Sequence, residues 1–279
     1  MKHIYQIWKS SFNEDDDYID FFTKEGLPLG HQLTSGPAEA PYASLFLFPV
    51  YYEHAGVSYP GFYLYALGIL PNYQNSGHGK TLINKAKLFA METGRHFILL
   101  QPANRGLYEY YRKLGFDEMI YRASFKISRS SIHNPTLFME HLNLCRLLDF
   151  SVPLINTPTK EHVFNCFSWP PQLREYMNKE CLFRGGRIID HAYCYPAQDA
   201  EGPFIEIKEI YSSSVDLSML IPSILDAFPQ IDRFSFYGKL QQKAITGVRE
   251  EPFAVVYFIN PELKKCHHSQ RSYFALGLD

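Results

Sequence analysis

The chain has 279 residues, of which 46% are hydrophobic and 16% are aromatic, and its formal net charge at pH 7 is −2. Such a chain can bury a large core in one or two domains. The near-neutral charge argues against a dedicated nucleic-acid-binding protein, which would carry a strong basic excess. No run approaches the ~18 apolar residues of a membrane span. The N-terminal residues lack the long apolar core and cleavage site of a secretion signal, so we expect a cytoplasmic protein without a membrane partner.

The five cysteines all lie in the second half of the chain, and no two of them form a C-x-x-C pair. This pattern fits unpaired thiols in a reducing compartment. Cys266, His267 and His268 could supply soft metal ligands. Adjacent residues rarely close a tetrahedral site without partners elsewhere, so we expect no metal.

The first half is predicted to begin with two helices and continue as a meander. Ile4, Trp8 and Phe12 fall at helical spacing, and Asp16 or Asp17 is expected to cap a second helix. Extended runs separated by Pro and Gly predict antiparallel strands. The predicted elements are strands 29–35, 44–52 and 62–70, helix 81–93, strand 96–100, helix 104–114 and strand 116–127.

The second half is predicted to repeat this order. Its elements are helix 136–148, strand 163–169, helix 171–184, strands 186–195 and 204–211, helix 215–228 and strands 233–237 and 253–259. The polar stretch 128–135 suggests two domains, 1–130 and 131–279. The predicted elements of both halves together indicate an α/β (α+β) protein with a mixed sheet flanked by helices. Residues 211–214 stand where the first half has a glycine-rich loop, but they contain no glycine. The second half is therefore expected to lack an anion site.

That glycine loop is the organising feature of the first half. It reads Gln74-Asn75-Ser76-Gly77-His78-Gly79-Lys80 and joins strand 62–70 to the following helix. A strand, a glycine loop and a helix in this order present free backbone N–H groups at a positive helix start. The stretch therefore predicts an anion site.

Two common phosphate-binding motifs do not fit the loop. A Walker motif needs glycine at position 74, where the chain has Gln74, and the strand ending at Leu100 is followed by no carboxylate for magnesium. A dinucleotide-binding fingerprint would need a third glycine at position 82, where the chain has Leu82. Nucleotide hydrolysis is therefore disfavoured.

The residues resemble the GNAT superfamily of N-acetyltransferases. The family's phosphate loop, Q/R-x-x-G-x-G/A, is matched from Gln74 to Gly79, and its second motif is matched by Asn104, Tyr111 and Gly115-Phe116. The resemblance covers about residues 1–127, and the rest looks like a degenerate second module. Three features depart from the family: Asn75 replaces a common glycine, His78 replaces an aliphatic or basic residue, and the first strand is missing or very short.

The resemblance implies the GNAT fold and an acyl-CoA-dependent N-acyltransferase. The expected reaction moves an acetyl group from acetyl-CoA to a primary amine of a small molecule or peptide, by direct attack in a ternary complex. The implied cofactor-binding residues are Leu67, Gly68, Ile69, Gln74, Asn75, Ser76, Gly77, His78, Gly79, Lys80 and Asn104. The loop would hold the pyrophosphate, and the strand end would hold the pantetheine arm. The amide of Ile69 or Leu70 would stabilise the oxyanion.

Tyr111 is the predicted general acid for the departing thiolate. An ordinary tyrosine pKa is roughly 10, so the phenol is protonated at neutral pH and able to donate. Asn104 either contacts the pantetheine arm or caps its helix. The general base stays open among Glu53, His54, the acidic turn 14–17 and the carboxylate of Asp279.

Two other functions are compatible with the same motifs. A binding or regulatory protein could keep the coenzyme A site without catalysis. Aminoacyl or peptidyl transfer on a double GNAT scaffold would require a basic channel for RNA, which the near-neutral charge disfavours. The sequence leaves a homodimer open and does not identify the acceptor.

Overall fold

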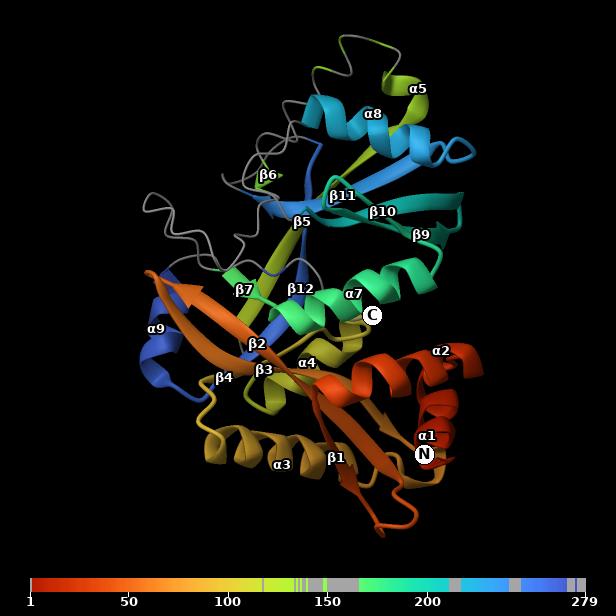
Figure 1. The fold of residues 1–279 in the computed structure, drawn as a ribbon. Helices are drawn as coiled ribbons and strands as arrows, with labels where there is room; N and C mark the ends of the chain where they lie inside the picture. The colour runs from red at the N-terminus through yellow and green to blue at the C-terminus, as the bar shows by residue number, and fades with distance from the viewer. Residues whose placement is uncertain are drawn as a thin grey trace.

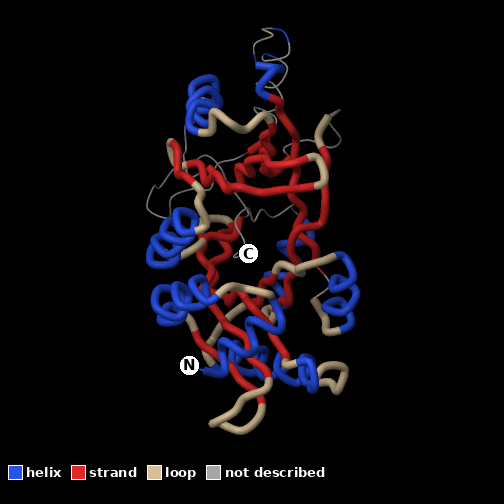
Figure 2. Tube along the Cα trace, turned by 90° about the vertical axis from the view of Figure 1, so that its right-hand side faces the viewer, coloured by secondary structure: helices blue, strands red, loops and turns tan. Residues whose placement is uncertain are grey.

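A computed structural model describes residues 2–116, 118–132, 134, 136, 139, 148–149, 166–210, 217–240, 247–269 and 274. One twisted sheet runs the length of the molecule with helices on both faces (Figures 1 and 2). Its main path is β1-β2-β3-β4-β12-β5-β11-β10-β9-β8, while β7 pairs with β2 and β6 pairs with β11. The predicted mixed sheet flanked by helices is confirmed.

The elements alternate along the chain. The helices are α1 (Lys2–Phe12), α2 (Asp16–Phe21), α3 (His78–Glu92), α4 (Arg105–Lys113), α5 (Arg129–Ile132), α7 (Pro171–Phe183), α8 (Leu217–Ala227) and α9 (Pro261–Ser269), with short turns η1 (Phe22–Gly26), η2 (Leu27–Leu29) and η3 (Pro71–Tyr73). The strands are β1 (His31–Ser35), β2 (Ala43–His54), β3 (Val57–Ile69), β4 (Phe97–Leu100), β5 (Glu118–Ser128), β6 (Leu148–Asp149), β7 (Cys166–Ser168), β8 (Arg187–Ile189), β9 (Ala192–Asp199), β10 (Gly202–Ile210), β11 (Arg233–Leu240) and β12 (Arg249–Phe258).

The first half follows the predicted order. Strands β1, β2 and β3 form the expected antiparallel meander, and β4 returns parallel to β3 after α3. Gly94 takes a positive φ of 68° directly after α3, where a left-handed residue commonly ends a helix. The cap of α2 differs from the prediction. Asp15, rather than Asp16 or Asp17, accepts a hydrogen bond from the Tyr18 amide at 2.7 Å.

The predicted strand 186–195 is a hairpin of two strands, β8 and β9. Asp190 and His191 form its turn with positive φ angles of 45° and 68°. Two such residues match the backbone twist of a two-residue hairpin, but glycine usually marks this turn. Because residues 190–191 contain no glycine, the sequence does not indicate this turn. Helix α9 was also not predicted.

The second half repeats the pairing of the first. Strands β9 and β10 are antiparallel, α8 follows β10, and β11 returns parallel to β10. The two halves also exchange strands, because β12 lies between β4 and β5 while β5 continues alongside β11. The predicted glycine-free loop 211–214 and most of the predicted helix 136–148 lie outside the described residues. The boundary at residue 130 stays a prediction.

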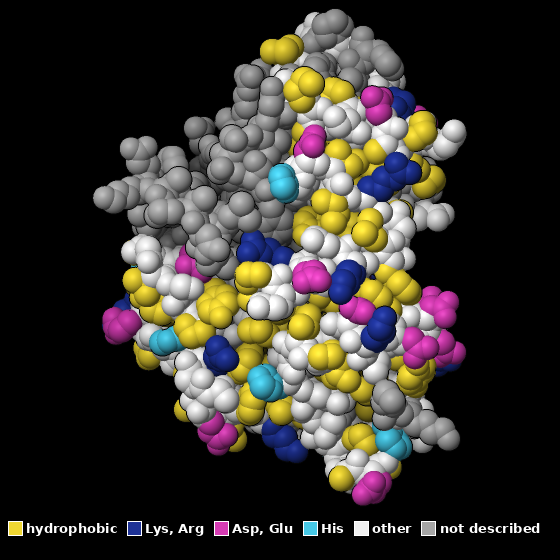
Figure 3. Space-filling view, viewed as in Figure 1, with side chains coloured by type: hydrophobic (Ala, Val, Ile, Leu, Met, Phe, Trp, Pro, Cys, Tyr) yellow, Lys and Arg dark blue, Asp and Glu magenta, His cyan; other side chains and the backbone are white. Residues whose placement is uncertain are grey.

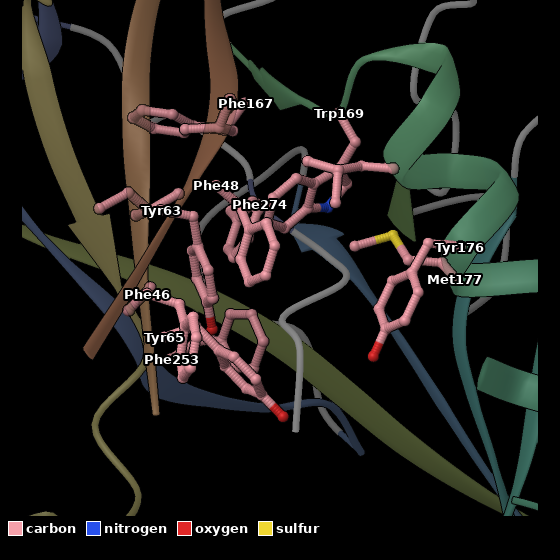
Figure 4. Close-up of a cluster of buried hydrophobic side chains, with 14 of the residues drawn as sticks. Phe46, Phe48, Tyr63, Tyr65, Phe167, Trp169, Tyr176, Met177, Phe253 and Phe274 are labelled. Atoms are coloured by element: carbon pink, nitrogen blue, oxygen red, sulfur yellow. The ribbon is translucent and has the colours of Figure 1, made fainter. Parts of the chain in front are cut away.

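Aromatic side chains from both halves share one core. On one face of the sheet, Trp8 of α1, Tyr63 of β3 and Tyr176 of α7 belong to a single buried cluster. Figure 4 shows Trp169 and Phe274 reaching the same cluster. The ring of Phe274 lies 5.7 Å from that of Tyr63, measured between centroids. Helices α3 and α4 cover the opposite face of the first half. Within the described part of the chain, no helix is long and apolar enough to cross a membrane.

Candidate functional site

Strands β3 and β4 part near the middle of the first half. Their parallel pairing is limited to Phe62 with Ile98 and Tyr63 with Leu99, although β3 continues to Ile69. Ala66 has a positive φ of 49° at the irregularity where β3 bends away from regular pairing with β2. Positive φ at a non-glycine residue is sparsely populated and often marks a functional backbone. The gap is therefore built into the backbone of β3.

A cavity of about 340 Å³ opens where the strands part. Its walls come from both faces of the sheet, with α1 and the following loop on one side and α4 on the other. The lining residues are Trp8, Phe12, Glu14, Tyr63, Leu64, Tyr65, Ala66, Leu67, Leu100, Gln101, Ala103, Leu107 and Tyr111. We call this space the transfer cavity. It connects the two sides of the sheet through the gap between β3 and β4.

Tyr111 of α4 lies in the wall of the transfer cavity. Its side chain is only 7% exposed, and its hydroxyl forms no hydrogen bond to another described residue. Burial raises the pKa of Tyr111, with a smaller contribution from Tyr110. The phenol is therefore protonated at neutral pH and free to donate to a ligand. Trp8 is a second donor in this wall, because its buried Nε1 lacks a partner among the described residues.

The glycine loop leads directly into the N-terminus of α3. Gly77 precedes the helix with a φ of 81°, and no side chain caps it. The first helical bond there runs from the Thr81 amide to the Gly77 carbonyl at 3.0 Å. The amides of His78, Gly79 and Lys80 therefore precede the helical ladder. Free N–H groups and the helix dipole make a helix start suitable for an anion, and binding of one by these residues stays a prediction.

Side-chain and backbone packing hold the loop against β3 and α4. Gln74 Nε2 donates to the Ile69 carbonyl at 3.0 Å, which ties the loop to the strand end. A Cβ added to Gly79 would lie 2.8 Å from the Tyr110 hydroxyl and 3.2 Å from Ile69 Cδ1. A side chain at this position would therefore require the ends of the Tyr110 and Ile69 side chains to shift. Asn75 takes a positive φ of 59°, so the turn tolerates asparagine at the position where many relatives carry glycine.

The backbone amides of Leu70 and Ile69 face opposite sides of the strand end. The Leu70 amide donates to the Tyr42 carbonyl at 2.9 Å and so is not available for an oxyanion. Successive amides of a strand point to opposite sides. The Ile69 amide therefore points away from β2, toward the gap. Leu67 lines the transfer cavity, whereas Gly68 packs against α1, where an added Cβ would lie 2.6 Å from Ile7 Cγ2.

The remaining predicted residues lie at the rims of the site. Asn104 caps α4, because its Oδ1 accepts a hydrogen bond from the Leu107 amide at 3.3 Å. The ring of His78 lies 4.6 Å from that of Tyr42. Ser76 and Lys80 are exposed. The roles of these residues toward a cofactor stay predictions.

The candidate bases fall at different places. Glu53 and His54 lie at the hairpin end of β2, beside the turn at 55–56, and do not line the transfer cavity. Burial raises the pKa of Glu53, while hydrogen bonds from Ser58 and Ser168 oppose this shift. Asp279 lies outside the described residues. Glu14 does line the transfer cavity, which singles it out from the acidic turn.

A second, polar cavity of about 630 Å³ lies beside the transfer cavity, between the N-terminal helices and the second half. Glu14 lines both. The other lining residues are Asp15, Tyr18, Glu180, Phe183, Arg184, Tyr195, Pro196, Glu206 and Lys208. Burial lowers the pKa of Lys208, which is 9% exposed and has Glu206 at 3.6 Å. The sequence missed these residues because their positions depend on contacts between the halves.

The parallel strands β3 and β4 thus part over a cavity beside the glycine loop. Residues 4–116 match the family model described as "Acetyltransferase (GNAT) family". The resemblance inferred from the two motifs is confirmed for this part of the chain. No curated protein sequence matches the chain.

Solved structures resemble the chain over nearly its whole length. A conserved protein of unknown function from Enterococcus faecalis V583, described as a probable N-acyltransferase, has a TM-score of 0.63 at 12% identity, with 93% of this chain and 70% of that chain covered. A GCN5-related N-acetyltransferase from Kribbella flavida has a TM-score of 0.61 at 10% identity, with 93% and 70% covered. Eis1 from Mycobacterium abscessus has a TM-score of 0.58 at 14% identity, with 94% and 72% covered. These similarities show the fold.

Proposed function

We propose that this protein is a cytoplasmic N-acyltransferase that moves an acetyl group from acetyl-CoA to a primary amine of a small molecule or peptide. The amine attacks directly in a ternary complex. The observation that carries the proposal is the Tyr111 hydroxyl, which lines the cavity where β3 and β4 part and has no hydrogen-bond partner among the described residues. A protonated donor in the gap between these strands suits the release of a thiolate.

Acetyl-CoA fits the residues that flank this cavity. The uncapped amides of His78, Gly79 and Lys80 suit its pyrophosphate without a metal. The β3 edge beyond Tyr63 is unpaired with β4 and suits the extended pantetheine arm, which accepts and donates hydrogen bonds as a strand does. Among the described residues, no group of three or more His, Cys, Asp or Glu side chains could hold a metal ion.

Each residue then has one task in the reaction. The Ile69 amide stabilises the negative charge that develops on the thioester oxygen when the amine nitrogen bonds to the carbonyl carbon. Tyr111 gives its proton to the sulfur as the carbon–sulfur bond breaks. The proposed reaction has no cysteine intermediate, because no cysteine precedes residue 145 and no described cysteine lines the transfer cavity.

Tyr111→Phe tests the proposal. Because the hydroxyl has no partner among the described residues, we expect the unfolding midpoint and acetyl-CoA affinity to stay near those of the wild type. Turnover should fall about 100-fold, the lower range for a lost general acid. Tyr108→Phe is the control, because the Tyr108 hydroxyl instead donates to the Pro252 carbonyl at 3.0 Å.

Turnover is measured as thiol release from acetyl-CoA with a panel of primary amines. Unchanged turnover in Tyr111→Phe would rule out the acid role. The alternative function is a non-catalytic coenzyme A-binding protein. It predicts a thermal shift with acetyl-CoA and no thiol release with any amine.

A further inference from the structure

The loop between α1 and α2 holds one carboxylate in a fixed place. Asn13 turns the chain after α1 with a φ of 56°, and Asp15 caps α2. Glu14 lies between these two anchored residues, and its side chain is 22% exposed. It faces the transfer cavity and the polar cavity at once. Among the described residues that line the transfer cavity, Glu14 is the one carboxylate.

Arg184, at the end of α7 in the second half, holds Glu14 by one oxygen. Its Nη2 lies 3.2 Å from Glu14 Oε1, while its Nε contacts Glu180 Oε1 at 2.6 Å. The guanidinium also stacks over the Tyr18 ring at 3.9 Å. An arginine fixed on three sides gives Glu14 a defined position. Glu14 Oε2 has no hydrogen-bond partner in the described part of the chain.

We propose that Glu14 is the catalytic residue that receives the proton of the acceptor amine, and that Arg184 is its positioning residue. This inference rests on the proposed acetyl transfer. A primary amine is mostly protonated at neutral pH, so a carboxylate in the cavity both attracts the ammonium group and accepts a proton. Glu14 Oε2 first takes one proton from the ammonium group and passes it to solvent, which leaves a neutral amine. The amine nitrogen then bonds to the carbonyl carbon, the carbon–sulfur bond breaks, Tyr111 protonates the sulfur, and Glu14 Oε2 takes the second proton from the nitrogen. Solvent then returns a proton from Glu14 to Tyr111, so the net products are an amide and a free thiol.

The arrangement gives the second half a part in the reaction. Glu14 and Arg184 are 170 residues apart, and they meet only because α7 packs beside α2. Phe21 and Phe183 stack at 4.6 Å across the same contact. The second half therefore helps to position the proposed proton acceptor.

Glu14→Gln tests the catalytic role, because glutamine keeps the size of the side chain and an oxygen for Arg184 but cannot take a proton. We expect turnover with primary amines to fall about 100-fold. The thermal shift with acetyl-CoA should stay unchanged. Asp16→Asn is the matched control, because it removes one negative charge from the same turn at an exposed carboxylate paired with Lys9. Asp16→Asn should keep wild-type turnover.

A double-mutant cycle with Arg184→Lys tests the positioning role. If Arg184 acts through Glu14, Arg184→Lys lowers turnover about tenfold in the wild type and has no further effect in Glu14→Gln. Equal losses in both backgrounds would show a merely structural role for Arg184. Wild-type turnover in Glu14→Gln would overturn the whole inference while leaving the acetyl transfer intact. Absence of turnover by the wild-type protein on every amine would instead overturn the proposed function, and this inference with it.

Discussion

The glycine loop allows a charge-reversal experiment with an internal control. Gly77 and Gly56 have φ angles of 81° and 75°, and an added Cβ would meet nothing within 4 Å at either position. Gly77 precedes α3, whereas Gly56 lies in the turn between β2 and β3, at the far end of the hairpin. Gly77→Glu and Gly56→Glu therefore introduce the same charge and the same backbone strain, about 1–2 kcal/mol each. Only Gly77→Glu places the charge beside the predicted anion site.

The expected loss of affinity follows from the charge. Two like charges ~4 Å apart repel by about 4 kcal/mol at an effective dielectric constant of ~20. An exposed glutamate can turn partly away, so we expect a loss of about 2–4 kcal/mol, or roughly 30- to 1,000-fold in the acetyl-CoA dissociation constant. Titration calorimetry measures the affinity, and thermal unfolding gives a second readout. Ligand at ~100 times its dissociation constant adds about 2.7 kcal/mol of stability, which raises Tm by roughly 5 °C in a chain of this size.

The comparison between the two variants decides the outcome. Gly56→Glu should lose stability and keep the ligand-induced shift in Tm. Gly77→Glu should lose both. Equal acetyl-CoA affinities in the two variants would refute the assignment of the anion site to the start of α3.

Three further predictions concern stability. In Glu53→Gln, glutamine keeps an oxygen that can accept hydrogen bonds from the neighbouring serines. Because burial raises the folded-state pKa of Glu53, the wild type should lose stability relative to the variant as pH rises through that folded-state pKa. A constant difference in urea midpoints between pH 4 and pH 8 would contradict this. Arg129→Met should lower the free energy of unfolding by about 2–3 kcal/mol, because the guanidinium donates to the carbonyls of Leu225, Phe228 and Ile231 at 2.7–3.0 Å, in the last turn of α8 and just after it. An unchanged chemical-denaturation midpoint would show that these bonds contribute nothing. A fragment of residues 1–130 lacks β12, the partner of both β4 and β5, so it should not unfold cooperatively. A sharp calorimetric transition of this fragment would disprove that the first half depends on β12.

Local chemistry explains what the sequence predicted. Gly77 precedes α3 with a left-handed backbone, and Asn104 caps α4 with its side chain. Both features depend on a few neighbouring residues, so the residue types alone indicate them. Tyr111 followed from its spacing before Gly115 in the family motif, and the structure places it in the wall of the transfer cavity.

Contacts between distant segments explain what the sequence did not predict. The pairing of Val255 with Leu100 places β12 beside β4, yet a strand's apolar pattern does not name its partner. The contact of Glu14 with Arg184 likewise has no local signal, because an acidic turn usually caps a helix or faces solvent. Asp15 caps α2 one or two residues before the predicted Asp16 or Asp17, while its neighbour Glu14 lines the cavities.

The exchange of strands explains why a second half without the predicted anion loop would be retained beside the first. Strand β12 pairs with β4 on the side away from β3, so it stabilises β4, which borders the gap. Helix α7 then fixes Glu14 through Arg184 from the other side of the transfer cavity. On the face in Figure 3, the described basic and acidic side chains are interspersed, so no single-sign surface accounts for the second half there. Its contribution to the proposed reaction is therefore positional: β12 supports β4 beside the gap, and Arg184 holds the proposed proton acceptor.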